Sequence, residues 1–286
     1  MITIIADSGS TKTDWALLDS HDVNPQDEIV RLSTQGINPI HQSDDVIRQV
    51  LLLELLPNLC GKSVDRVCFY GSGVRPEKEA PMVQLLSEIF PTAVVVEAHS
   101  DLLGAARALC AHNEGVACIL GTGANSCLYD GERIAMNTPA LGYILGDEGS
   151  GAVLGKRLIH GLYNGSMGCG VVKIFEHETG LSLPMIIDRV YRQPLSNRWL
   201  ASLSEFVFRH LDNVNIRQLV KDNFVDFLIY HVVPYNRKDL PVSFVGSVAW
   251  YYQDQLRDAV SELKYQVGII LRSPLDGLVN YHCTVV

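Results

Sequence analysis

Residues Ile2 to Leu18, ITIIADSGSTKTDWALL, are the most informative segment of this chain. An apolar run leads into a small polar turn and then into alternating apolar residues, which predicts a strand, a tight turn and a second strand. Glycine and hydroxyl groups at such a turn bring donors close to a ligand, and an anion is the natural occupant. Asp7 ends the first strand and would face the same space, and a carboxylate beside a phosphate needs a cation between them. The segment therefore predicts a site for a metal-bound nucleotide phosphate, with an ordinary surface hairpin as the alternative that it leaves open.

A second copy of this design runs from Val116 to Tyr129, where a Gly-Thr-Gly turn again joins two predicted strands. Asp130-Gly131 is a hairpin signal before a third strand near residues 133–136. Two such hairpins are much less probable by chance than one, so the repeat favours phosphate binding. Neither turn is a P-loop, because no Gly-Lys-Ser/Thr follows at the required spacing. The second turn is no dinucleotide fingerprint either, since Ser126 occupies the third glycine position and a strand follows.

A third element lies near the C-terminus, where residues 242–245 predict a buried strand that runs into Gly246-Ser247. A helix is predicted from about Trp250 to Leu263. A Gly-Ser turn can let a flat ring approach the backbone, whereas the simpler interpretation is a serine N-cap after a close strand–helix turn. Taken alone, the element favours the simpler interpretation.

The rest of the chain predicts an α/β first part and a mostly helical later part. Apolar patterns predict strands at 28–33, 66–70 and 93–97, helices at 44–56 and 77–90, and, after residue 151, helices at 152–161, 184–191, 197–211 and 216–233. Strand–helix alternation indicates a partly parallel sheet that is covered on both faces. The apolar stripe Val46, Val50 and Leu53 is predicted to face the core.

Composition restricts the partners. The net charge of −9 argues against nucleic acid or an anionic membrane as the main partner, because both favour basic surfaces. Seven cysteines without a CxxC pair indicate reduced thiols of a cytoplasmic protein. The N-terminal apolar run is too short for a signal peptide, and no stretch approaches the length of a membrane span.

Asp101 is the best candidate for a catalytic base. It is predicted to begin a helix behind Ser100 as N-cap, after a buried strand, which places its carboxylate at the edge of a cleft. An aspartate in the first turn of a helix is more often a partner of the helix dipole. From the residues alone, the dipole role is favoured.

The order of the motifs resembles the N-acetylglucosamine kinase family, with its related BadF/BadG/BcrA/BcrD-like ATPases, in the superfamily of sugar kinases and actin. The matching segments are 7–13 and 120–126 for the two phosphate motifs, 245–249 for the adenosine motif, and 34–39, 70–73, 100–106, 142–151 and 273–278 elsewhere. The resemblance implies a two-lobed ribonuclease H-like (actin-like ATPase) α/β fold, with mixed sheets flanked by helices and a nucleotide cleft between the lobes. It also implies lobes at 1–113 and 114–286, with the last helix packing back on the first lobe.

The resemblance implies phosphoryl transfer from magnesium-bound ATP to the 6-hydroxyl of an amino sugar, most directly N-acetylglucosamine. Asp101 would then accept the proton of the sugar hydroxyl, and Asp7 would hold Mg²⁺. The residues implied for the nucleotide are Ser10, Thr11, Lys12, Gly121, Thr122, Gly123, Gly246, Ser247 and Ala249. Those implied for the sugar are Asn38, Gly73, Asn125 and Asp147; as an alternative, Asn38 caps its own loop.

Two alternatives stay open at this point. An ATPase that activates a 2-hydroxyacyl-CoA dehydratase-type enzyme shares the nucleotide motifs but needs cysteines for an iron–sulfur cluster, and Cys127 lacks an evident partner in the sequence. Glucosamine or N-acetylmuramic acid could replace N-acetylglucosamine, because side chains between the motifs decide the pocket. A homodimer is a family expectation only.

Overall fold

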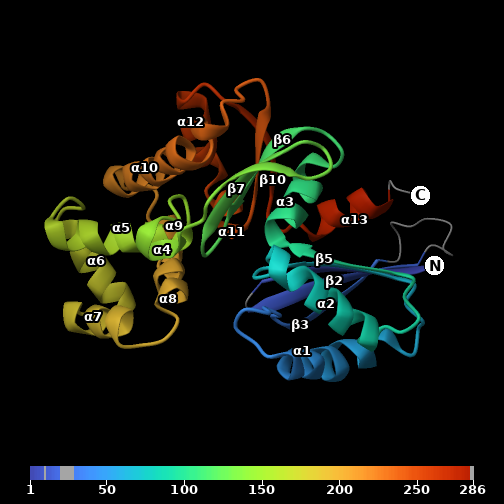
Figure 1. The fold of residues 1–286 in the computed structure, drawn as a ribbon. Coiled ribbons are helices and arrows are strands. Elements are labelled where there is room, and N and C mark those ends of the chain that lie inside the picture. Colours follow the sequence, from blue (N-terminus) through green and yellow to red (C-terminus); the bar gives the residue numbers. More distant parts are fainter. Residues whose placement is uncertain (10, 20–28, 284–286) are drawn as a thin grey trace. The chain divides into compact units, whose positions relative to one another are not determined.

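A computed structural model describes residues 1–9, 11–19 and 29–283 (Figure 1). The chain divides into two compact units. Unit 1 comprises residues 1–112, 131–133 and 274 onward, and unit 2 comprises residues 113–130 and 134–273. Each unit contains its own five-stranded sheet.

The sheet of unit 1 has the order β3-β2-β1-β4-β5. Its strands are β1 (Ile2–Ser8), β2 (Lys12–Asp19), β3 (Val30–Gln35), β4 (Arg66–Gly71) and β5 (Val95–Ser100). The first three strands are antiparallel, while β4 and β5 run parallel to β1. The predicted hairpin is thus present, and β3 and β5 each begin two residues later than the apolar pattern predicts.

Alternate residues of β1 face two different cores, which explains why the strand is almost wholly apolar. Ile4 and Ala6 pack with α1 (Asp44–Val50) and α2 (Pro76–Ile89). Ile5 packs on the other face with α3 (Asp101–Cys110) and α13 (Leu275–Cys283). Both faces of this sheet are therefore covered by helices, as predicted, and α13 lies beside α3 (Figure 1).

The predicted core stripe after residue 44 is wrong in two of its three positions. Val46 and Leu53 are exposed, by 40% and 73%, and only Val50 is buried. The buried positions of this segment are Ile47, Val50, Leu51 and Leu55. The helix also changes to a π-helical stretch at Leu51–Leu55, in which hydrogen bonds span five residues, so the α-helical spacing does not continue through it.

Unit 2 repeats the topology of unit 1. Its strands are β6 (Gly115–Leu120), β7 (Ala124–Tyr129), β8 (Ile134–Thr138), β9 (Pro241–Val245) and β10 (Gln266–Leu271). The order is β10-β9-β6-β7-β8, so again three antiparallel strands are followed in sequence by two strands parallel to the first of them. The two phosphate-type hairpins, β1–β2 and β6–β7, occupy equivalent positions in the two sheets.

Helices of unit 2 fill the sequence between β8 and β9 and between β9 and β10. They are α4 (Gly142–Leu145), α5 (Gly151–Asn164), α6 (Cys169–Thr179), α7 (Leu183–Tyr191), α8 (Ser196–Ser202), α9 (Ser204–Arg209), α10 (Val214–His231), α11 (Ser247–Tyr251) and α12 (Gln253–Glu262). Helix α6 was not predicted from the sequence. The predicted helix at 197–211 is two helices, and the one predicted from Trp250 begins earlier, at Ser247, and is interrupted at Tyr252.

In the described part of the chain, the structure contains no helix that combines the length and apolar character needed to cross a membrane.

Candidate functional site

The β1–β2 turn is closed by its own backbone. The N–H of Gly9 donates to the carbonyl of Lys12 at 3.0 Å. Thr11 and Lys12, both predicted to bind phosphate, are exposed at this turn. Ser10, predicted with them, lies outside the described residues.

Two buried hydroxyls fix the loop that follows β3 to this hairpin. Ser8 Oγ and Thr13 Oγ1 lie 2.6 Å apart, and the N–H of Ile37 contacts both, at 3.1 and 3.2 Å. Ser8 Oγ also donates to the carbonyl of Ile37 at 2.9 Å. These hydroxyls are therefore structural, and they hold the residue after Ile37, the predicted sugar ligand Asn38, beside the first phosphate turn.

Asn38 and Gly73, both predicted to bind sugar, are in direct contact. Gly73 has φ of +86°, and a Cβ there would lie 2.3 Å from Asn38 Oδ1, so only glycine fits. Asn38 Nδ2 donates to Ser72 Oγ at 3.3 Å, and its Oδ1 accepts from the N–H of Ile40 at 3.0 Å. The loop-capping role weighed from the sequence is thus present, and the sugar-binding role stays a prediction.

Asp7 and Asp101 lie at the carboxyl ends of parallel strands of one sheet. Asp7 pairs with Tyr70 across β1 and β4, and Gly71 pairs with Ser100 across β4 and β5. Ser100 is the N-cap of α3, as predicted, and its Oγ accepts from the N–H of Leu103 at 3.2 Å. Because carboxyl ends of parallel strands share one edge, the register brings the metal candidate and the base candidate to the same place.

The electrostatics of this edge are unbalanced. Burial, together with the negative charges of Asp101 and Asp14, raises the pKa of Asp7 to about 7 against the opposing effect of Lys12. Lys12 itself is paired with Asp14, at 2.7 Å. Burial also raises the pKa of Asp101, against backbone N–H groups at the start of α3 that lower it. The carboxylates outnumber the nearby cation, which is the charge pattern of a site that receives a further cation.

N–H groups at the start of α5 donate hydrogen bonds to the carbonyl groups of the β6–β7 turn. The N–H of Gly151 donates to the carbonyl of Gly121 at 2.8 Å, and the N–H of Ala152 donates to that of Thr122 at 3.2 Å. The N–H of Gly121 donates to the carbonyl of Gly123 at 3.0 Å. Within the described residues, the N–H groups of Thr122 and Gly123 make no hydrogen bond, so the turn presents donors, as a phosphate-binding turn must.

Asp147 stabilises this turn through hydrogen bonds to the backbone. Its carboxylate accepts hydrogen bonds from the N–H groups of Ala124 and Gly142, which lower its pKa, while burial raises it. A Cβ at Gly123 would lie 3.0 Å from Asp147 Oδ2, and the backbone of Asp147 is left-handed, with φ of 59°. The predicted sugar ligand is thus 8% exposed and already ties the turn to α4. Asn125, also predicted to bind sugar, accepts from Asn137 Nδ2 at 3.0 Å.

The predicted adenosine motif touches the second phosphate turn directly. Gly246 has φ of +123°, and a Cβ there would lie 2.3 Å from the carbonyl oxygen of Leu120. Ala249 is buried, whereas Ser247 is exposed and lines a cavity of about 470 Å³ with Phe208, Tyr251 and other residues. Sequence reasoning missed this aromatic cavity, although two consecutive tyrosines shortly after the motif were a usable signal.

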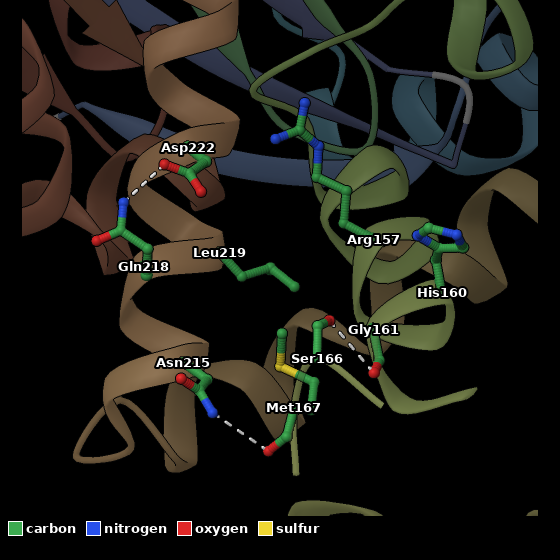
Figure 2. Close-up of a pocket in the computed structure, with 9 residues that line it drawn as sticks. All are labelled: Arg157, His160, Gly161, Ser166, Met167, Asn215, Gln218, Leu219 and Asp222. Atoms are coloured by element: carbon green, nitrogen blue, oxygen red, sulfur yellow. Dashed lines mark hydrogen bonds between the residues drawn. The ribbon is translucent and has the colours of Figure 1, made fainter. Parts of the chain in front are cut away.

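A second cavity, of about 360 Å³, lies between α5 and α10 and is shown in Figure 2. Arg157 and His160 come from α5, and Asp222, which accepts from Gln218 Nε2 at 2.7 Å, comes from α10. Its lining includes none of the predicted site residues that the structure describes. This cavity is therefore separate from both phosphate turns.

Comparison with solved structures places the chain among sugar kinases. A protein from Porphyromonas gingivalis, named provisionally as an N-acetylglucosamine kinase, is 45% identical, with 99% of both chains covered and a TM-score of 0.91. The chain belongs to the N-acetylglucosamine kinase family. This confirms the family predicted from the order of the motifs.

More distant structures support the fold of this family member. A protein from Chromobacterium violaceum with the same provisional name is 19% identical, with 98% of both chains covered and a TM-score of 0.71. A ROK hexokinase from Thermus thermophilus is 12% identical, covering 100% and 99% of the chains, with a TM-score of 0.50. The predicted actin-like ATPase fold is confirmed. No protein-family model and no curated protein matches the chain.

We predict that Gly246→Ala disrupts the second phosphate turn, because the new methyl group would lie 2.3 Å from the backbone oxygen of Leu120. We expect unfolding free energy to fall by about 1–3 kcal/mol and nucleotide binding to weaken, measured by chemical denaturation and calorimetry. Gly165→Ala is the control, since Gly165 also has positive φ but has open space around it. Equal losses in both variants would mean that backbone strain, and not the contact with Leu120, is responsible.

The raised pKa of Asp7 predicts a pH dependence of stability. Below about pH 4 the carboxyl is protonated in both the folded and the unfolded state; as pH rises to about 7, the unfolded chain releases the proton first. The free energy of unfolding of the wild type should therefore fall over this range in metal-free buffer. Asp7→Asn should not show this fall, so at pH 8 its free energy of unfolding should exceed that of the wild type by at most about 4 kcal/mol. Thermal melts from pH 4 to 8 test this. Asp45→Asn, an exposed control, should run parallel to wild type, and a parallel Asp7→Asn curve would contradict the assignment.

Proposed function

We propose that this family member is an ATP-dependent kinase that phosphorylates the 6-hydroxyl of an amino sugar, with N-acetylglucosamine as the first candidate. The observation that carries the proposal is the pair of carboxylates, Asp7 and Asp101, at one edge of the unit 1 sheet. Asp7 has the charge environment of a cation ligand. Asp101 lies at the start of a helix, and burial raises the pKa of its carboxyl group. Phosphoryl transfer to a hydroxyl requires one group of each kind.

The residues around Asp7 fit a magnesium ion. Asp7, Asp14 and Asp101 place negative charge on the same region, and Lys12 offsets only part of it. Carboxylate oxygens are the ligands that Mg²⁺ prefers. Asp7 would hold the ion, which when bound neutralises charge on the β- and γ-phosphates.

Asp101 would take the proton of the acceptor. The 6-oxygen of the sugar forms a bond to the γ-phosphorus, the bond from that phosphorus to the ADP oxygen breaks, and the hydroxyl proton passes to the Asp101 carboxylate. Burial raises the pKa of this carboxyl, which strengthens it as a base. Most of the rate would come from positioning, since phosphoryl transfer needs little covalent chemistry from the protein.

Both turns would bind the phosphates of the nucleotide. Ser10, Thr11 and Lys12 would serve from the first turn, and Gly121, Thr122 and Gly123 from the second. Gly246 and Ala249 would back the adenosine, and the aromatic cavity beside Ser247 would hold the base. Arg272 lies over the ring of Tyr251, with the guanidinium carbon 5.6 Å from the ring centroid, so one wall of this cavity is held in place.

The sugar would be bound by Asn38, Gly73, Asn125 and Asp147. Asn38 is rigidly held, which suits it to orient a hydroxyl. The carboxylate oxygens of Asp147 have lone pairs beyond those used by its two backbone hydrogen bonds, and these could accept from sugar hydroxyls. Asp147 would also act indirectly, by holding the second turn in place. We further propose lobes at 1–113 and 114–286, with the last helix packed on the first lobe, a homodimer and a cytoplasmic location.

The dehydratase-activator alternative has less support. Cys127, the cysteine considered for an iron–sulfur cluster, is wholly buried in β7.

A coupled assay of ADP release against a panel of N-acetylglucosamine, glucosamine and N-acetylmuramic acid tests the proposed activity. We expect ATP turnover to depend on one amino sugar, and mass spectrometry of the product to place the phosphate on its 6-oxygen. ATP hydrolysis at one rate with or without every sugar would overturn the kinase proposal. Iron and sulfide analysis of anaerobically purified protein tests the activator alternative in parallel.

We predict that Asp101→Asn lowers kcat by about 100-fold or more, because the amide keeps the size of the side chain but cannot accept the proton. Nucleotide affinity, measured by calorimetry, should change little. Asp45→Asn serves as the control for loss of one negative charge and should retain wild-type kcat. Wild-type phosphorylation by Asp101→Asn would remove Asp101 from the role of base.

A further inference from the structure

Tyr70 lies under the helix that begins with Asp101. A Cβ at Gly104 would lie 2.8 to 3.0 Å from Cβ, Cγ and Cδ1 of Tyr70, so the backbone of α3 rests on the tyrosine itself. One turn further along α3, Arg107 Nη1 donates to the Tyr70 hydroxyl at 2.7 Å. The Arg107 guanidinium also lies over the Tyr70 ring, 5.7 Å from the centroid. Tyr70 therefore holds α3 at two successive turns.

The same tyrosine belongs to the strand that separates the two carboxylate-bearing elements. In β4 it pairs with Asp7 of β1 on one side and with His99 of β5 on the other. Its position thus links the strand of the proposed metal ligand to the helix of the proposed base.

Tyr70 is also bound to α13, which lies beside α3 on the same face of the sheet. Tyr70 Oη and His282 Nε2 lie 2.9 Å apart, and His282 Nδ1 lies 3.8 Å from Cys68 Sγ. An arginine can only donate, so the Tyr70 oxygen accepts from Arg107, and we assign the proton of Tyr70 to His282 Nε2. His282 is then neutral, with its proton on Nδ1 facing the sulfur. Burial and the nearby guanidinium groups lower the pKa of His282 to about 4, which agrees with this assignment.

Helix α13 is also in backbone contact with α3. A Cβ at Gly277 would lie 2.4 Å from the carbonyl oxygen of Ala108. Charged groups around the network are Glu97, which pairs with Arg66 at 2.9 Å and lies 3.7 Å from Arg107, and His99, 3.7 Å from Glu97. The network of Arg107, Tyr70, His282 and Cys68 thus joins α3 and α13, which lie on the same face of the sheet, to strand β4.

We propose that Tyr70 is a positioning residue for phosphoryl transfer, which holds α3 through the Arg107–Tyr70–His282 chain and so fixes the Asp101 carboxylate. The proposal rests on the assignment of Asp101 as the base. Its effect should appear in kcat and not in substrate binding, because Tyr70 acts on the reacting geometry through α3.

Tyr70→Phe tests this, since the ring that packs on Gly104 remains and only the hydroxyl is lost. We expect kcat to fall about 10-fold, with KM for magnesium-ATP and for the sugar changed less than about twofold. In an Asp101→Asn background, the same substitution should have no further effect on kcat. A full 10-fold loss in that background would overturn the proposal, because Tyr70 would then act independently of Asp101.

Two matched sets of variants separate positioning from general stability. Tyr235→Phe removes another buried hydroxyl, which contacts Ser126 Oγ at 2.7 Å and the N–H of Thr138 at 3.0 Å, and it should lower the melting temperature without lowering kcat. His282→Gln keeps an acceptor for the Tyr70 proton and should retain kcat, whereas His282→Leu should behave like Tyr70→Phe. Loss of kcat in Tyr235→Phe equal to that in Tyr70→Phe would overturn the proposal.

Hydrogen exchange distinguishes failure of this proposal from failure of the proposed function. Amides of α3 should exchange faster in Tyr70→Phe than in wild type, whereas amides of α2 should not change. Faster exchange in α3 combined with an absence of sugar phosphorylation by wild type would reject the kinase function and keep the role of Tyr70 in holding α3. Unchanged exchange in α3 would overturn the proposal whatever the activity.

Discussion

The parallel register of β1, β4 and β5 is the constraint on which the proposed chemistry of unit 1 depends. Pairing of Asp7 with Tyr70, and of Gly71 with Ser100, brings a strand end and a helix start to one edge of the sheet. A shift of one residue in either pairing would turn Asp7 or the start of α3 to the opposite face. Burial restricts this register, because alternate residues of β1 pack into two different cores. A shift of the strand would remove both sets of side chains from the cores that they fill.

Unit 2 depends on close backbone contacts. Gly246 lies against the carbonyl of Leu120, and the first N–H groups of α5 bind the carbonyls of Gly121 and Thr122. The Asp147 carboxylate binds the N–H groups of Ala124, just after the turn, and of Gly142 in α4. These contacts leave the turn with donor groups on its free surface and with little freedom to move. The phosphate binding proposed for this turn would benefit, because the entropic cost of ordering the turn is met on folding and not on binding.

The two units apply the same topology with different support. In unit 1, the hairpin is braced by buried hydroxyls, Ser8 and Thr13, whereas in unit 2 a carboxylate and a helix N-terminus do the equivalent work. This difference in support agrees with the charged groups proposed to bind at each hairpin. The first turn is placed among carboxylates and a lysine, where a metal ion is expected, and the second presents neutral backbone donors.

Much of this architecture was predictable from the sequence. The hairpins at Asp7 and Gly121, the capped start of α3 at Ser100 and the sheet covered on both faces depend on local patterns, because turn chemistry, capping and periodicity act over a few residues. The order of the motifs sufficed to indicate the family. Local patterns failed where the helix after Asp44 changes to a π-helical stretch, and where α6 follows a glycine-rich loop, since packing and not propensity sets those elements.

Local patterns in the sequence were enough to place the two turns, the capped start of α3 and the polar residues beside them, but not α6 or β10. Only the tertiary structure decided that Gly73 lies on Asn38, that Asp147 faces inward to hold a turn, and that Tyr70 joins α3 to α13 through Arg107 and His282. Tyr70 and His282 are separated by 212 positions in the chain. The physical reason is that such contacts depend on the register of strands and the packing of helices brought together by the whole core, and no local pattern of residues carries that information.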